Sequence, residues 1–295
     1  MRHDITFTSG QETCAAWLYL PESGTPAPVI VMAHGLGAVR AMRLDAFAER
    51  FREAGYACLL FDYRYFGDSS GEPRQLLKIS SQLEDWKNAV QHAQNEPRVD
   101  GSNVIVWGSS FSGGHVLKTA ATVPGIAGVM SQCPFTSGVA SGLALHPVSS
   151  IKVSFLAILD FLTMPFRKTP VMVNLVGHPG DAALMSAHDA MDGYNALIPE
   201  GSNFPAYVAA RFGFMIPTYF PGASAAGIDA PTLLIACLKD TVAPVRPTLR
   251  YARKLKKGEV IELDAGHFDI YVGDWFEKNI TLQLDWLARH FPVNC

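Results

Sequence analysis

The chain has 295 residues with a formal net charge of −3, and hydrophobic residues make up 48% of it. A chain of this length buries a large core without disulfides, and it predicts one large domain or a domain with a sizeable insertion. Basic residues form no concentrated run, so the composition predicts no nucleic-acid partner.

The first half alternates strand-like and helix-like segments, the pattern of a mostly parallel sheet covered by helices on both faces. Strands are predicted from apolar runs over residues 15–20, 28–33, 56–61, 103–107 and 126–132. Helices are predicted where apolar residues recur three or four positions apart, over residues 42–54, 80–94 and 112–121.

The alternation stops in the segment 134–228, which has about half the charge density of the rest and many Pro and Gly residues. We interpret this segment as an inserted, mainly helical cap with short, bent helices. The core is then formed by residues 1–133 and 229–295. Within its second piece we predict strands over 231–237 and 259–263 and helices over 246–255 and 279–290.

The five cysteines show no spacing typical of a metal site: Cys14, Cys58, Cys133, Cys237 and Cys295. Three of them lie within or beside predicted strands, and we interpret them as small core residues in a reducing compartment. No phosphate-binding loop or ligand spacing is present either, so we expect no metal and no organic cofactor.

The N-terminus turns polar at once and lacks the apolar core of a signal peptide. The longest apolar stretch, residues 153–166, is interrupted by Asp160 and is too short to span a bilayer. We therefore expect a cytoplasmic protein with no membrane span.

The strongest chemical signal is the segment WGSSFSGG at residues 107–114, between a predicted strand and a predicted helix. A nucleophile at the tip of so tight a turn needs small residues two places before and after it. Gly108 and Ser112 take those places around Ser110, although serine replaces the usual glycine at 112. Ser109 is the rival nucleophile, but a tryptophan two places before it fits the turn poorly. The alternative is that these serines only cap a helix.

A serine nucleophile needs a base, and the base needs an acid to orient it. Asp240 follows a predicted strand, where the carboxyl edge of the sheet would present an acid; its alternative role is to cap a turn. His267 follows the last predicted strand and is the candidate base, because imidazole titrates near neutral pH. Asp264 and Asp269 compete as acids, but each lies within three residues of the histidine and is expected to cap or pair locally.

The loop that follows the first central strand, His34-Gly35-Leu36-Gly37, supplies a fourth element. The backbone amides of Leu36 and Phe111 are the predicted donors of an oxyanion hole. Gly35 and Gly37 allow the main chain to approach the reaction centre closely. We interpret His34 as a hydrogen-bonding brace for this loop rather than as a proton carrier.

With these residues assembled, the chain resembles the α/β-hydrolase superfamily over nearly all of its length except the cap. The segment FDYRYFGDS at residues 61–69 resembles the superfamily's D-x-R-G-x-G-x-S segment, with Tyr65 where glycine is usual, which puts the local loop geometry in question. Residues 240–244 and 266–269 resemble the acid and base segments. The fold that this implies is a mostly parallel central sheet with helices on both faces and the inserted cap.

Within the superfamily, the chain is similar to dienelactone-hydrolase-like and prolyl-dipeptidase-like serine hydrolases. It also resembles the thiohydrolases and acyltransferases that release or move polyketide chains. The pattern Gly-x-Ser-x-Ser-Gly-Gly-His at residues 108–115 carries this subgroup resemblance.

Together these features predict a serine hydrolase of carboxylic esters or thioesters that forms an acyl-enzyme on Ser110. The charge-poor cap indicates a small-molecule substrate with an apolar acyl part, and six cap residues are candidates to line its pocket: Phe155, Phe161, Phe166, Phe204, Phe212 and Phe214. The alternative is an acyltransferase in which a bound acceptor or carrier protein replaces water. Amide or peptide hydrolysis and a catalytically silent binding protein are the less favoured alternatives. The oligomeric state is open.

Overall fold

Residues 1–22 and 24–293 are described by the computed structural model, and within them eight strands form one sheet in the order β1-β2-β4-β3-β5-β6-β10-β11. Neighbours from β4 to β11 along the sheet are parallel, whereas β1–β2 and β2–β4 are antiparallel. The strands are β1 (Arg2–Ser9), β2 (Glu12–Tyr19), β3 (Pro28–Ala33), β4 (Ala57–Phe61), β5 (Asp100–Ser109), β6 (Ile126–Gln132), β10 (Thr232–Cys237) and β11 (Gly258–Leu263).

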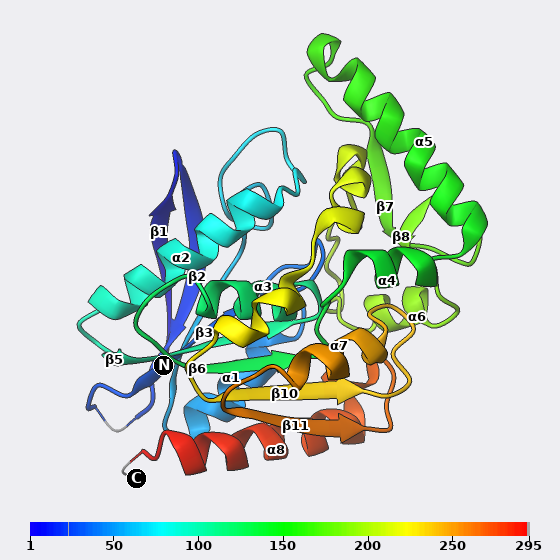
Figure 1. The fold of residues 1–295 in the computed structure, drawn as a ribbon. Helices are drawn as coiled ribbons and strands as arrows, with labels where there is room; N and C mark the ends of the chain where they lie inside the picture. The colour runs from blue at the N-terminus through cyan, green and yellow to red at the C-terminus, as the bar shows by residue number, and fades with distance from the viewer. Residues whose placement is uncertain (23, 294–295) are drawn as a thin grey trace.

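Helices cover both faces of this sheet, with α1 and α8 on one face and α2 and α3 on the other (Figure 1). Their bounds are α1 (Leu44–Glu53), α2 (Ile79–Asn95), α3 (Phe111–Ala120), α7 (Val245–Ala252) and α8 (Gly273–His290). The apolar periodicity explains the packing, because α1 buries Leu44, Phe47, Ala48 and Phe51 on its inner face. The predicted alternation of strands and helices, and with it the fold class, is confirmed.

The sequence analysis did not predict β1. This strand pairs with β2 along its whole length at the edge of the sheet, and most of its residues are exposed or half-buried. An edge strand that faces solvent with polar side chains gives little hydrophobic periodicity. The signal for a strand is therefore weak in the sequence, although the hairpin with β2 is regular.

The segment 134–228 contains more helix than strand, as predicted for the cap, but it also holds a small sheet that was not predicted. Its helices are α4 (Gly138–Ala144), α5 (Pro147–Thr163), α6 (Ala190–Asn195) and the 3₁₀ helices η1 (Met164–Phe166), η2 (Ala210–Phe214), η3 (Ile216–Thr218) and η4 (Pro221–Gly227). The sheet has the order β8-β7-β9, formed by β7 (Met172–Val176), β8 (Ala183–Met185) and β9 (Tyr207–Ala209). Strands this short show too little alternation to stand out in a sequence.

Helix α5 stands away from the main sheet, with β7 beside it (Figure 1). Among the described residues, the continuous helical segment Pro147–Phe166 is long and apolar enough to cross a membrane by length and composition. Most of this segment is not buried inside the protein. The expectation of a stretch too short to span was wrong, because the helix begins at Pro147, a residue that favours a first helical turn. Length and composition alone are weak evidence, and the absence of a span stays a prediction.

Four of the five cysteines are buried and unpaired: Cys14, Cys58, Cys133 and Cys237. The fifth, Cys295, lies outside the described residues. Burial raises the pKa of Cys133 to about 12, so this thiol stays protonated. The four described thiols therefore occupy the core positions that small apolar side chains would occupy.

Candidate active site

Ser110 occupies the sharp turn between β5 and α3, with φ 56° and ψ −119°. A positive φ is strained for a residue with a side chain, and such strain concentrates at functional positions. Gly108 is required here, because a Cβ at this position would overlap the backbone carbonyl of Ser112. Gly108 and Ser112 therefore approach each other closely on the two sides of Ser110, as the sequence pattern predicts.

Ser112 replaces the usual glycine, and its buried hydroxyl has a specific partner. Tyr63 Oη donates a hydrogen bond to Ser112 Oγ over 3.0 Å, and Trp86 Nε1 donates to Tyr63 Oη over 2.8 Å. All three side chains are buried. The departure from the glycine pattern thus comes with a hydrogen-bond chain from helix α2 to the turn.

His267 lies between Ser110 and Asp240 and contacts both. Its Nε2 lies 2.9 Å from Ser110 Oγ, and its Nδ1 lies 2.7 Å from Asp240 Oδ2. The other Asp240 oxygen accepts hydrogen bonds from the amides of Val242 and Ala243 over 2.9 and 2.6 Å. The loops after β5, β10 and β11 thus bring the three predicted residues into one hydrogen-bonded line. This is the arrangement in which an imidazole can take a proton from a serine while a carboxylate holds its tautomer.

The rival residues are engaged elsewhere. Ser109 Oγ is fully buried, accepts a hydrogen bond from Gln132 Nε2 over 2.9 Å and contacts the hydroxyl of Tyr271. Asp264 pairs with Lys239 at 2.8 Å on the surface. Asp269 accepts a hydrogen bond from the amide of Gly266 over 2.7 Å. The expectation that both aspartates cap or pair locally agrees with these contacts.

The loop after β3 lies directly against Ser110. A Cβ at Gly35 would lie 2.9 Å from Ser110 Cβ, so only glycine fits there. Within residues 1–22 and 24–293, neither the Leu36 amide nor the Phe111 amide donates to a protein acceptor, and both residues line a cavity that Ser110 also lines. The Phe111 amide opens helix α3, whose positive dipole end favours an anion. Two free amides beside a nucleophile are what a developing oxyanion requires.

The other two residues of this loop hold its shape. His34 Nε2 lies 2.8 Å from the carbonyl oxygen of Met42, and His34 Nδ1 accepts a hydrogen bond from the Gly35 amide over 2.7 Å. Burial lowers the pKa of His34 to about 4, so the ring is neutral at neutral pH. Gly37 has φ 65°, and a side chain there would overlap Leu175 of β7.

The loop of residues 61–69 contains Tyr65 where glycine is usual in the superfamily. This tyrosine has φ 74°, the left-handed conformation that glycine adopts readily. Gly67 also has a positive φ, and its close contact with the buried Asp62 leaves no room for a side chain. The backbone amides of Arg40 and Asp68 both donate to the Asp62 carboxylate, over 2.8 and 3.1 Å. Tyr65 thus adopts a backbone conformation that is usual for the glycine it replaces.

A narrow, mainly apolar cavity of about 60 Å³ adjoins Ser110 between the core and the cap. Its lining includes Leu36, Phe111, Phe135, Leu145, Leu184, Met185, Phe212, Ile216 and Val242. Of the six predicted phenylalanines only Phe212 lies here; Phe204 lines a different groove, and the other four are exposed on the outside of the cap. Their assignment to the pocket was wrong, because the sequence did not reveal which face of α5 and η2 turns inward.

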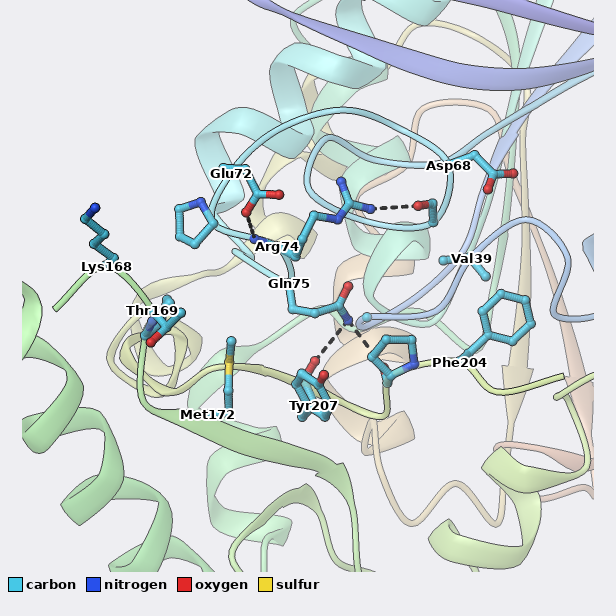
Figure 2. A pocket seen from close by; sticks show the side chains of 15 residues that line it. Val39, Asp68, Glu72, Arg74, Gln75, Lys168, Thr169, Met172, Phe204 and Tyr207 are labelled. Carbon is cyan, nitrogen blue, oxygen red and sulfur yellow. Dashed lines mark hydrogen bonds between the residues drawn. The ribbon is translucent and has the colours of Figure 1, made fainter.

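A larger groove lies elsewhere, with a volume of about 880 Å³, between the loop 67–75 and the cap (Figure 2). Two of its polar side chains, Arg74 and Gln75, are already engaged in hydrogen bonds with the backbone. Arg74 donates to the carbonyl oxygens of Ser69 and Gly67, and Gln75 Nε2 donates to those of Pro205 and Tyr207. Although this groove is larger, it does not include Ser110, so the narrow cavity is the better candidate for the acyl group.

One group of potential metal ligands occurs among the described residues: Cys133, Asp240 and His267, with ligand atoms within 4.8 Å of one another. The geometry fits a metal poorly, because His267 is held between Ser110 and Asp240. The raised pKa of Cys133 also keeps its thiol protonated, whereas a metal needs the thiolate. That the protein needs no metal or cofactor stays a prediction.

Comparison with known proteins gives a family. The chain matches the family model of serine aminopeptidase, S33, over residues 24–174. It is 51% identical to the quorum-quenching protein AidA of Acinetobacter baumannii (strain MDR-ZJ06), over 98% of this chain and 95% of that relative. It is 25% identical to a polyketide transferase of Penicillium sp, over 98% and 97% of the two chains. The crystal structure of the α/β-hydrolase GrgF from Penicillium sp. sh18 matches with a TM-score of 0.85 at 24% identity, covering 99% of this chain and 100% of that one. The chain therefore belongs to the serine aminopeptidase S33 family of α/β-hydrolases.

Proposed function

We propose that this protein is a serine hydrolase that cleaves ester or thioester bonds of small molecules with an apolar acyl part. The observation that carries the proposal is the hydrogen-bonded line from Ser110 Oγ through His267 to Asp240. It lies beside two amides that are free among the described residues and an apolar cavity that opens onto the serine. Nucleophile, base, acid and oxyanion donors are thus all present in one place.

In the first half of the reaction, Ser110 Oγ attacks the substrate carbonyl carbon while His267 Nε2 takes the hydroxyl proton. The tetrahedral oxyanion accepts hydrogen bonds from the amides of Leu36 and Phe111. When the intermediate collapses, His267 returns the proton to the leaving alcohol or thiol, and the acyl group remains on Ser110. Asp240 keeps the His267 Nδ1 proton in place and stabilises the imidazolium.

In the second half, His267 takes a proton from a water molecule that attacks the acyl-enzyme. The resulting oxyanion uses the same two amides. The carboxylic acid is released when the proton returns to Ser110 Oγ, and the free enzyme is restored. The proton transfers between Ser110 and His267 use atoms that lie within hydrogen-bond reach of each other, and Asp240 lies within reach of His267.

The relatives support an acyl substrate. The 51% identical relative is named a quorum-quenching protein, and others are named thiohydrolase or polyketide transferase. The apolar lining of the narrow cavity agrees with an apolar acyl chain. It contains no charged side chain that could pair with a charged acyl group. We therefore place the substrate among uncharged acyl esters, acyl lactones and acyl thioesters.

The test is a panel of p-nitrophenyl esters, acyl lactones and acyl thioesters of increasing chain length, assayed with wild type, Ser110→Ala and Ser109→Ala. Loss of a catalytic serine costs up to about 10⁶-fold in kcat, so Ser110→Ala is expected to retain only background turnover. Ser109→Ala removes the neighbouring hydroxyl but leaves the triad, and we expect kcat/KM within about tenfold of wild type. Activity retained by the Ser110 variant would refute the proposal. A fluorophosphonate probe, read out by peptide mass spectrometry, should label Ser110 alone.

Acyl transfer is the second candidate, because full-length relatives at 25% identity are named polyketide transferases. The acyl-enzyme would be the same, and an alcohol or amine, free or on a carrier protein, would replace water. Product mass spectrometry with and without added alcohol and amine acceptors separates the two. Free acid as the sole product in every reaction would exclude transfer to the acceptors tested.

A further inference from the structure

Helix α5 is apolar on two opposite faces. Its inner stripe consists of Ser149, Val153, Ala157 and Asp160, which are buried against the rest of the cap. Its outer side chains are between 45% and 71% exposed: Val148, Ile151, Phe155, Ile158 and Leu162. At 100° per residue, the outer five are centred on the side of the helix opposite the inner stripe. A surface helix of a soluble monomer normally has charged and polar residues on that side.

The spacing of the outer residues is regular. Steps of three, four, three and four positions lead from Val148 to Ile151, Phe155, Ile158 and Leu162. This is the a/d pattern with which one helix packs along another, each side chain inserting between those of the facing helix. Scattered hydrophobic residues on a surface would not follow such a repeat. The pattern therefore indicates a second helix as the occupant of this face.

The size of the exposed face agrees with a specific interface. The five outer side chains leave on the order of 500 Å² of apolar surface uncovered, at the upper end of the range for the largest patch of a typical monomer. Two such faces in contact would bury on the order of 1,000 Å², which is the size at which specific interfaces between proteins begin. A second copy of this chain brings a face of matching length and matching spacing.

The charges around α5 favour an antiparallel arrangement. Arg167 and Lys168 follow its C-terminal end and are exposed. Asp181 lies at the N-terminal end, in a loop whose Gly180 accepts a hydrogen bond from Lys152 and donates one to Ser149. Antiparallel helices would bring the basic end of one copy beside the acidic loop of the other, whereas parallel helices would place like charges together.

A lipid surface fits these observations less well. Helices that lie in a membrane interface carry basic residues along the flanks of the apolar face. The flanks of α5 carry the neutral Ser150 and Ser154, and their one lysine, Lys152, is held by the carbonyl oxygen of Gly180. The basic pair after the helix lies at one end only.

We propose that two copies of this chain associate through the outer faces of α5, with the two helices antiparallel about a two-fold axis near Phe155. The two Phe155 side chains meet at the axis, and Val148 of one copy packs near Leu162 of the other. Such an isologous contact is self-complementary and closes as a dimer. It would join the two molecules cap to cap and leave both main sheets on the outside.

The test compares Phe155→Asp with Ser154→Asp, which adds the same charge one position away on an exposed flank of the same helix. Light scattering and sedimentation velocity should show a wild-type dimer, a dimer for Ser154→Asp and a monomer for Phe155→Asp, with the dissociation constant raised at least about 100-fold. Ile151→Lys provides a second variant on the same face. Circular dichroism and thermal unfolding of the monomeric variants check that the fold is intact, since the outer side chains make little contact within one copy.

Single cysteines test the orientation, in a Cys295→Ser background. With the two helices antiparallel, Phe155→Cys should cross-link to itself on oxidation, because only residues at the axis meet their own copies. Val148→Cys should cross-link to Leu162→Cys in a mixture but not to itself. Self-cross-linking of Val148→Cys would overturn the antiparallel arrangement.

Three results would overturn the dimer itself. The first is a wild-type monomer at about 100 µM, where an interface of this size should be saturated. The second is a dimer that Phe155→Asp and Ile151→Lys leave unchanged. The third is a monomer that binds phosphatidylglycerol–phosphatidylcholine vesicles and loses this binding on Phe155→Asp, which would assign the face to a membrane.

Discussion

The core and the cap differ in where their apolar side chains face. Strands β4 and β10 are buried at every position, and the helices of the core turn their apolar sides inward onto the sheet. Of the seventeen large hydrophobic residues exposed among the described ones, fourteen lie in the segment 134–228. The core thus buries its own apolar surface, whereas the cap leaves much of its own uncovered. This difference agrees with the two proposals, which place the catalytic residues in the core and the contact between copies in the cap.

The cap packs against the core through a shared hydrophobic cluster, which includes the contact of Phe212 with Phe111, and through a few polar contacts. Thr241 donates a hydrogen bond to Asp189 of the cap over 2.7 Å, next to the proposed catalytic acid. Gln75 of the core donates to two backbone carbonyl oxygens around β9. Substitutions in the core should therefore alter catalysis or overall stability, while substitutions in the cap should alter local order and association.

The largest expected effect is in the core, for Asp240→Asn. This change keeps the shape of the side chain but removes the charge that holds the His267 Nδ1 proton, and such a loss lowers kcat by about 10⁴-fold in a serine triad. Asp264→Asn is the matched control, because Asp264 is exposed and pairs with Lys239. We expect its kcat to stay within about twofold of wild type. Equal losses for the two variants in ester hydrolysis would argue against Asp240 as the acid.

In the cap, the largest effect is expected for Asp160→Ala. The buried Asp160 carboxylate accepts four hydrogen bonds, from the amides of Val171 and Arg211 and from the Arg211 guanidinium. Removing one partner of such a pair costs about 3–5 kcal/mol, and α5 would lose its main polar anchor. Hydrogen exchange should show faster exchange in 147–176 with the main sheet unchanged. Asp192→Ala, at an exposed cap position, is the control; equal exchange in both variants would show that the anchor is dispensable.

The core and the cap also differ in how much of their structure the sequence predicts. The parallel strands of the core were predicted close to their observed bounds, because buried parallel strands read as continuous apolar runs, whereas β1 was missed and α8 begins six residues before its predicted start. The order of Ser110, Asp240 and His267 after three such strands was enough to predict their meeting in space.

The cap could not be predicted in this way. Helix α5 is apolar on both faces, so its composition does not tell which side turns inward, and this is why its Phe155 and Phe161 were placed in the wrong location. Asp160 was interpreted as an interruption of an apolar stretch, whereas its side chain points inward to Arg211, a partner 51 residues away. Long-range pairs of this kind leave no periodic signal in a sequence.

A smaller effect, on stability against acid, is expected for the buried histidines of the core. Burial lowers the pKa of His115 to about 3, below its usual 6.5, so the unfolded chain binds a proton that the folded protein excludes. This residue's contribution to the free energy of unfolding is complete above pH 6.5 and is lost as the pH falls toward 3. Between pH 7.5 and 4.5 the loss is about 2–3 kcal/mol.

The measurement is urea unfolding of wild type, His115→Gln and His290→Gln at several pH values. His115→Gln should show a shallower fall in the free energy of unfolding with acid, even if its stability at pH 7.5 is lower because Tyr219 and Gln82 lose their partner. His290 is exposed, and its replacement should leave the slope unchanged. A wild-type slope in the His115 variant would mean that other groups control the acid sensitivity.

The smallest effect concerns Ser112, the one residue of the nucleophile turn that departs from the glycine pattern. Ser112→Gly restores that pattern but removes the acceptor of the buried Tyr63 hydroxyl and puts a glycine into helix α3. A lost hydrogen bond of this kind costs about 1 kcal/mol, and glycine in a helix costs about as much again. Ser112→Ala separates the cost of the lost hydrogen bond from the cost of glycine in the helix, because it removes only the hydroxyl. We expect unfolding free energies in the order wild type, Ser112→Ala, Ser112→Gly. If Ser112→Gly were as stable as wild type, the hydrogen-bond chain from Trp86 would contribute nothing, and the serine would be a neutral replacement for glycine.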